Sequence, residues 1–139
     1  MIVVDTNVVA YALIEGTHTA LARRVWSLDP AWRLPDLWAH EYLNILATYA
    51  RVGGMSLRKA TQLWNQATEL LSGCLRPVDM LLALELAVEN NISAYDAQFV
   101  ALARSLGVAC VTEDQRLLGA FPQETMSMRD FCEGGGAGP

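Results

Sequence analysis

Two acidic residues follow aliphatic runs that are typical of buried parallel strands. Asp5 comes directly after the run Ile2 to Val4, and Asp114 comes two residues after the run Val108 to Thr112. An uninterrupted apolar run suits a parallel strand that is covered on both faces. Because ligands of open parallel sheets bind beyond the carboxyl ends of the strands, we expect both carboxylates at one functional edge. The alternative for Asp5 is structural: Asp5 or Thr6 caps the helix that follows.

Two further acids lie near the starts of predicted helices. Glu41 lies at the edge of the apolar face of a helix predicted over residues 37–52, where a carboxylate is costly without a cation or a donor. Asn44, three residues on, is the candidate donor, and the alternative is a rim glutamate whose stem lies on the apolar face. Asp96 stands three residues after Ser93 in a capping-box pattern, so helix capping is its alternative role.

A cluster of these four carboxylates would have a defined chemistry. Two carboxylates ~4 Å apart repel by roughly 4 kcal/mol at an effective dielectric of ~20, so four of them need a cation or protons. All-oxygen ligands without a His or Cys cluster select Mg²⁺, with Mn²⁺ as a substitute. Such an ion activates water and stabilises the charge that develops on a phosphate. Thr6, Asn7 and Thr112 are the candidates to hydrogen-bond and orient the acids.

Composition limits the classes of function. The 139 residues suit one domain, and ten basic against fifteen acidic residues give a net charge of −5. A diffuse basic coat for nucleic acid is therefore excluded, and any such contact must be a local patch or run through a metal. No apolar run approaches the ~18 residues of a membrane span. Three scattered cysteines and the lack of a signal peptide predict reduced thiols in a cytoplasmic protein.

Short strand-like segments alternate with amphipathic helices, which predicts an α/β fold with a central parallel sheet of four to five short strands and helices on both faces. We expect one domain over residues 1–131 and a disordered glycine-rich tail over 132–139. The predicted helices cover residues 8–14, 19–28, 37–52, 57–71, 79–89 and 94–106, and the predicted strands cover 1–5, 32–35, 108–112 and 124–128.

The order of the acidic segments resembles that of PIN domains, and closely that of VapC-type toxin ribonucleases. The matching stretches are Val3 to Asn7, Glu41-Tyr42, Ser93 to Ala97 and Val111 to Asp114. The resemblance spans the folded chain and implies a PIN-like Mg²⁺-dependent endoribonuclease with RNA as substrate and a VapB-like antitoxin as partner. It also implies the residues that hold the metal and carry catalysis, namely Asp5, Glu41, Asp96 and Asp114.

Two other classes of protein are alternatives to a nuclease. A phosphotransfer enzyme of the haloacid-dehalogenase kind needs a second aspartate where Asn7 stands, and that class and the response receivers both need a lysine near a late strand. The only lysine is Lys59, within a predicted helix, so this class is disfavoured. A catalytically silent PIN scaffold that binds RNA or protein is the second alternative. Its weakness is that four unused buried carboxylates are costly.

The helices on either side of Gly53-Gly54-Met55 are expected to form a protruding hairpin. One side can pack on the sheet, whereas the other would leave an apolar patch that soluble monomers seldom tolerate. We therefore expect a homodimer, and a groove by the second to fourth helices that takes an amphipathic antitoxin segment. The alternative is that the large side chains of this region are simply core; they are Trp26, Trp38, Tyr42, Leu63 and Trp64.

Overall fold

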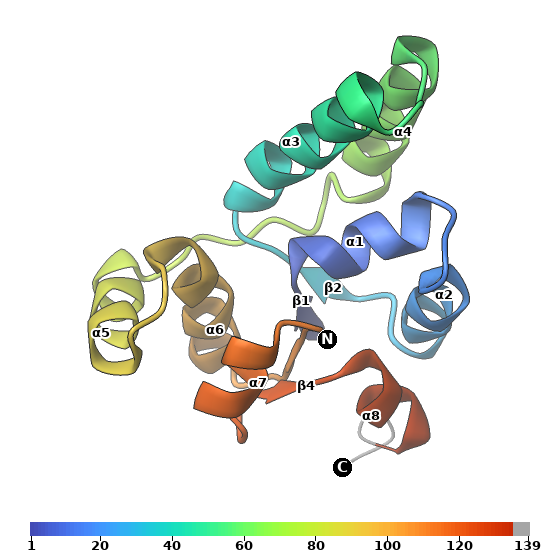
Figure 1. The fold of residues 1–139 in the computed structure, drawn as a ribbon. Helices are drawn as coiled ribbons and strands as arrows, with labels where there is room; N and C mark the ends of the chain where they lie inside the picture. Colours follow the sequence, from blue (N-terminus) through green and yellow to red (C-terminus); the bar gives the residue numbers. More distant parts are fainter. Residues whose placement is uncertain (135–139) are drawn as a thin grey trace.

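Four short strands form one parallel sheet in the middle of the molecule, in the order β2-β1-β3-β4 (Figure 1). The computed structural model describes residues 1–134. Val3 in the central strand lies opposite Arg33 on one side and Cys110 on the other. The predicted parallel sheet and its edge strand near residue 125 are therefore confirmed. The strands are β1 (Ile2–Val4), β2 (Trp32–Arg33), β3 (Cys110–Val111) and β4 (Thr125–Met126).

Helices cover both faces of this sheet. Ile2 and Val4 of β1 join a large core cluster with residues of α1 to α4 and α8, whereas Val3 packs with Phe99 and Leu102 of α6. Both faces of β1 are thus dry, which is why its sequence is apolar throughout and does not alternate. The helices are α1 (Thr6–Leu13), α2 (Thr19–Leu28), α3 (Leu37–Val52), α4 (Leu57–Leu70), α5 (Met80–Asn90), α6 (Ala94–Leu106), α7 (Gln115–Ala120) and α8 (Met128–Glu133).

Local signals set several helix ends as expected. The Ser56 hydroxyl accepts the backbone N–H of Lys59 and so caps α4, and Gly107 adopts a positive φ of 68° where α6 ends. The short helices α7 and α8 were not predicted. Because α8 continues to Glu133, the predicted tail begins too early, and its last part, residues 135–139, lies outside the described residues.

The α3–α4 hairpin projects from one end of the molecule (Figure 1). Three of its large side chains are core: Trp38, Tyr42 and Leu63 are buried, and the Tyr42 hydroxyl donates to the Leu63 carbonyl at 3.3 Å. Trp64 is partly buried and stacks on Trp38 with 6.3 Å between ring centroids. For Trp38, Tyr42 and Leu63 the core alternative is therefore the correct one. These side chains hold the two helices together and do not form a surplus surface.

The expected state of the cysteines and the question of a membrane-spanning helix can both be compared with residues 1–134. Cys74, Cys110 and Cys132 are all free thiols, and the first two are buried. Among residues 1–134, none of the helices combines the length and the apolar character that a membrane crossing requires.

Candidate active site

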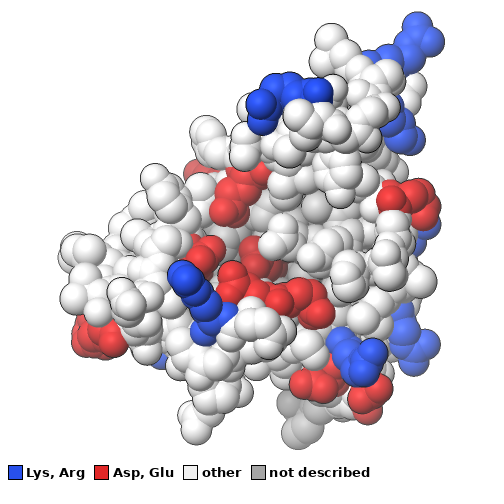
Figure 2. All heavy atoms as spheres, in the orientation of Figure 1, with Lys and Arg blue, Asp and Glu red and all other residues white. Residues whose placement is uncertain are grey.

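The four predicted acids line a single pocket at the carboxyl ends of β1 and β3. Asp5 follows β1, Glu41 lies on α3, Asp96 lies on α6, and Asp114 directly precedes α7. Figure 2 shows acidic side chains gathered around the hollow in the middle of this face, below the α3–α4 hairpin. The pocket has a volume of about 240 Å³ and is lined by Asp5, Thr6, Asn7, Glu41, Asn44, Ile45, Asp96 and Asp114.

Asp5 is fixed by the pairing of β1 with β3. Its backbone N–H donates to the Val111 carbonyl at 3.0 Å, and its side chain is only 7% exposed. The Thr112 hydroxyl donates to Asp5 Oδ2 at 2.8 Å. Although Asp5 occupies the cap position of α1, its side chain makes no capping hydrogen bond. The capping role that the sequence left open for Asp5 is therefore not realised in this structure.

The environment of Asp5 disfavours its charged form. Burial is the main cause that raises the pKa of the Asp5 carboxyl, and the charges of Asp96 and Asp114 raise it further. The hydrogen bonds from Thr112 and from the backbone of Thr6 act in the opposite direction. Asp5 is thus a buried carboxylate that lies near other carboxylates and accepts hydrogen bonds from uncharged donors.

Glu41 receives its hydrogen bond from α1. The Thr6 hydroxyl, itself buried, donates to Glu41 Oε1 at 2.7 Å. Burial raises the pKa of Glu41, and the charges of Asp5 and Asp96 add to this rise, while the Thr6 hydrogen bond lowers it. The prediction that Asn44 orients Glu41 is wrong for the described residues. Asn44 lines the same pocket, but the hydroxyl that reaches Glu41 comes from Thr6.

Asp96 and Asp114 relate differently to the helices that carry them. At the start of α6 the Ser93 hydroxyl is the cap and accepts the Asp96 backbone N–H at 3.0 Å, so the Asp96 carboxylate is left to line the pocket. Burial and then the charge of Asp114 raise the pKa of Asp96. Asp114 does cap its helix: Oδ1 accepts the backbone N–H groups of Arg116 at 2.8 Å and Leu117 at 3.2 Å. Its other oxygen takes no part in this cap.

Thr112 links two of the acids. While its hydroxyl donates to Asp5, it also accepts the backbone N–H of Asp114 at 3.0 Å. Thr6 and Thr112 therefore hydrogen-bond the acids, as predicted. Asn7 is exposed at the pocket wall. The neighbouring acid Glu113 serves the fold, since Oε2 accepts the Met128 N–H at the start of α8 at 2.8 Å.

The donor set fits a hard divalent cation. The pocket lining offers four carboxylates, an amide-bearing Asn7 and Asn44, and neither His nor Cys. Within residues 1–134, however, no three acidic, His or Cys side chains converge as a ready-made metal group. Mg²⁺ keeps several of its waters and is usually held by one or two carboxylates. The arrangement therefore fits a partly hydrated Mg²⁺ better than a closed cage of direct ligands.

Comparison with known proteins supports this fold. The PIN domain family model matches residues 2–120. VapC ribonuclease Mb0985 of Mycobacterium bovis is 35% identical over 120 residues, which cover 84% of this chain and 88% of that protein. Ribonuclease VapC3 of Pyrobaculum aerophilum is 28% identical over 124 residues, which cover 87% and 95%.

A solved structure shows the same fold at lower identity. The crystal structure of PAE2754 from Pyrobaculum aerophilum superposes with a TM-score of 0.76 at 21% identity, covering 95% of this chain and 93% of that one. The match to the family model spans most of the chain, from β1 to the end of α7. This chain belongs to the PIN domain family, and it is of the VapC type within that family.

Proposed function

We propose that this protein is a Mg²⁺-dependent endoribonuclease that hydrolyses RNA phosphodiester bonds at the acidic pocket and acts as the toxin of a toxin–antitoxin pair. The observation that supports it most is that carboxylates from four separate elements line one pocket. Relatives at up to 35% identity carry the name ribonuclease, which supports the reaction class.

Each lining residue has a role that follows from its contacts. Asp5 and Asp96 would be the most direct holders of a cation, with Glu41 and Asp114 completing the set. A bound Mg²⁺ would lower the pKa of the attacking water and stabilise the charge on the phosphate, and Mn²⁺ would supply the same chemistry. Thr112 and Thr6 hold the Asp5 and Glu41 carboxylates in place by donating to them. A carboxylate with a defined orientation needs no reorganisation during the reaction.

A protein with a net negative charge needs basic side chains close to the site in order to bind RNA. Arg116, two residues after Asp114, lies close enough to Asp96 to lower its pKa. Within the described residues it forms no ion pair, unlike Arg23 and Arg104, which pair with glutamates. Arg116 is therefore available to contact a phosphate beside the acidic pocket.

The decisive experiment measures cleavage of short single-stranded RNA with and without divalent metal. Excess EDTA should abolish cleavage and added Mg²⁺ or Mn²⁺ should restore it, because the four carboxylates repel one another and the substrate without a cation. Asp5→Asn should be inactive, and Asp79→Asn, which alters an exposed capping aspartate on α5, should cut like the parent. Full activity in EDTA would refute the metal-dependent reaction. Metal-independent RNA binding without any cleavage would favour the silent scaffold.

Two exposed apolar surfaces support the proposed protein partners. A groove of about 260 Å³ runs between α3 and α4 and is lined by Leu43, Leu46, Ala47, Ala50, Leu57, Ala60, Thr61 and Trp64. We assign it to an amphipathic antitoxin segment docked by its apolar face. The second surface lies on α5, where Met80, Leu81, Leu84 and Val88 are exposed. We assign this surface, which the sequence did not single out, to the second copy of a homodimer.

A further inference from the structure

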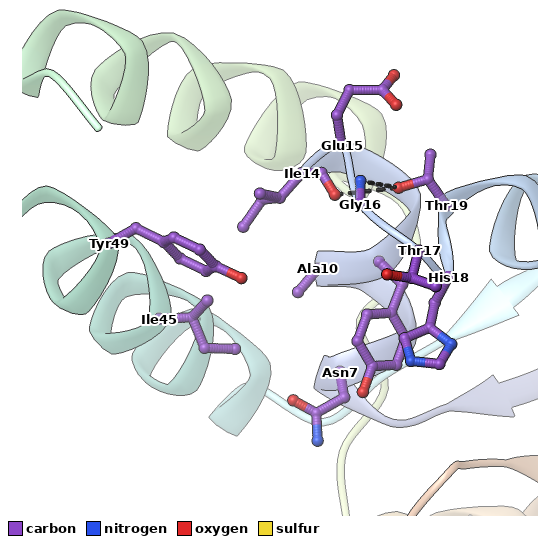
Figure 3. Close-up of a pocket in the computed structure, with 11 residues that line it drawn as sticks. Asn7, Ala10, Ile14, Glu15, Gly16, Thr17, His18, Thr19, Ile45 and Tyr49 are labelled. Carbon is purple, nitrogen blue, oxygen red and sulfur yellow. Dashed lines mark hydrogen bonds between the residues drawn. The ribbon is translucent and has the colours of Figure 1, made fainter. Parts of the chain in front are cut away.

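A second pocket adjoins the acidic one. It has a volume of about 280 Å³ and shares two lining residues, Asn7 and Ile45, with the acidic pocket. Its walls are α1, the segment from Ile14 to His18, and α3 (Figure 3). Figure 3 shows Tyr49 and Ile45 pointing from α3 toward Ala10 of α1 and Ile14, which follows α1. None of the roles assigned so far uses this pocket.

Aromatic side chains line this second pocket on two sides. The rings of Tyr11 and His18 lie 4.6 Å apart at an angle of 44°. Tyr49 comes from the facing helix and remains 44% exposed, although a tyrosine in a core would be covered. An aromatic pocket with an amide, a hydroxyl and an imidazole at its rim offers both stacking faces and hydrogen-bonding groups. Asn7, Thr17 and His18 supply that rim.

The wall between α1 and α2 is held in shape before any ligand arrives. The Gly16 N–H donates to the Thr19 hydroxyl at 2.9 Å, and that hydroxyl donates to the Ile14 carbonyl at 3.1 Å (Figure 3). Thr19 is itself buried, so these hydrogen bonds are partly shielded from water. A preformed wall reduces the ordering cost of binding, which favours a ligand-binding role over a passive surface hollow.

We infer that this pocket receives one unpaired nucleobase of the RNA, next to the phosphodiester bond that is cut; the inference rests on the proposed function. Proteins recognise single-stranded RNA by stacking bases on Tyr and His rings and by hydrogen-bonding the base edges. Because Asn7 and Ile45 border both pockets, a nucleotide with its phosphate at the acids places its base here. The Asn7 amide both donates and accepts, so it can read a base edge.

The test uses a series of short single-stranded RNA substrates that the protein cuts, each with one abasic nucleotide at a different position. The value of kcat/KM with Mg²⁺ is measured for each substrate. At one position beside the cut, loss of the base should lower kcat/KM of the parent by about 5- to 150-fold, the range expected for one stacked base. Tyr49→Ala should show a similar loss on the intact RNA and little further loss at that abasic position. Tyr49→Phe, which keeps the ring, should stay within about twofold of the parent.

Val52→Ala is the matched control, because Val52 is a residue of the same helix that is 77% exposed and lines neither the acidic pocket, nor the second pocket, nor the α3–α4 groove. Thermal melting should show that all three variants are folded. Equal losses at the abasic position in the parent and Tyr49→Ala would overturn the inference while leaving the nuclease intact. A Tyr49→Ala protein that cuts RNA normally but loses a protein partner would assign the pocket to that partner. A parent that cuts no RNA refutes the proposed function, and the nucleobase site with it.

Discussion

Asp5→Asn should remove activity yet leave the metal-free protein as stable as the parent or more stable. Asparagine has nearly the same shape as aspartate, and its carbonyl oxygen can still accept from the Thr112 hydroxyl, which lies 2.8 Å from Asp5 Oδ2. The substitution removes the negative charge and replaces one acceptor oxygen with an NH₂ group. That charge is buried and is opposed by the carboxylates of Asp96 and Asp114.

The size of the effect follows from the pocket. A sphere with the pocket volume of about 240 Å³ is ~8 Å across, and two charges at that separation repel by ~2 kcal/mol at an effective dielectric of ~20. Salt and water reduce this repulsion further. Against the gain stands the loss of a charge-assisted hydrogen bond, which is ~1 kcal/mol stronger than a neutral one. We expect a net stabilisation between about 0 and 2 kcal/mol, or up to ~8 °C in melting temperature for a domain of this size.

Thermal melting with and without Mg²⁺ provides the assay. At ten times the dissociation constant, Mg²⁺ should stabilise the parent by about 1.4 kcal/mol and should hardly affect Asp5→Asn. Asp79→Asn is the control, because Asp79 Oδ1 caps α5 by accepting the Leu82 N–H at 3.1 Å and asparagine caps equally well. A loss above ~2 kcal/mol in metal-free Asp5→Asn, with Mg²⁺ still stabilising it, would refute the reasoning and restore a structural role for Asp5.

Three further outcomes are expected. Thr112→Val should cost about 2 to 4 kcal/mol in urea unfolding, since it leaves Asp5 without a side-chain donor and the Asp114 N–H without an acceptor; Thr112→Ser should cost less. Because the pKa values of Asp5, Glu41 and Asp96 are raised, these acids bind protons more readily in the folded state than in the unfolded one. The stability of the metal-free protein should therefore fall as pH rises from about 4 through the folded pKa values. Over the same pH range the Mg²⁺ concentration for half-maximal cleavage should also fall, because the deprotonated acids bind the cation. Leu81→Asp, at a side chain 79% exposed, should yield a folded monomer in light scattering.

The contact between Asp5 and Thr112 could be anticipated from the sequence because it follows from strand pairing. Val4 of β1 lies opposite Val111 of β3, so the next residue of each strand, Asp5 and Thr112, must also be neighbours. Two apolar runs that each end near an acid are therefore enough to predict this contact, provided that the two runs pair in a parallel sheet.

The donor to Glu41 could not be anticipated in the same way. Thr6 and Glu41 are 35 residues apart, and their contact depends on how α3 packs against α1, a tertiary feature without a local sequence signal. Asn44 was preferred because only its spacing on the helix was visible. The cap that Asp114 provides was missed for a related reason: α7 has six residues, too few to show helical periodicity.

The choice of hydrogen-bond donors distinguishes a cation site from a structural acidic cluster. Asp5 and Glu41 each receive a side-chain hydrogen bond from a threonine hydroxyl, which orients a carboxylate but does not neutralise it. Among residues 1–134, no arginine or lysine lines the pocket, even though pairing with a basic side chain is the usual way to accommodate a buried acid. Selection for folding alone would favour such a pair or an apolar replacement. Oriented but uncompensated charge is what the proposed site for a cation, and for the phosphate that it would bind, requires.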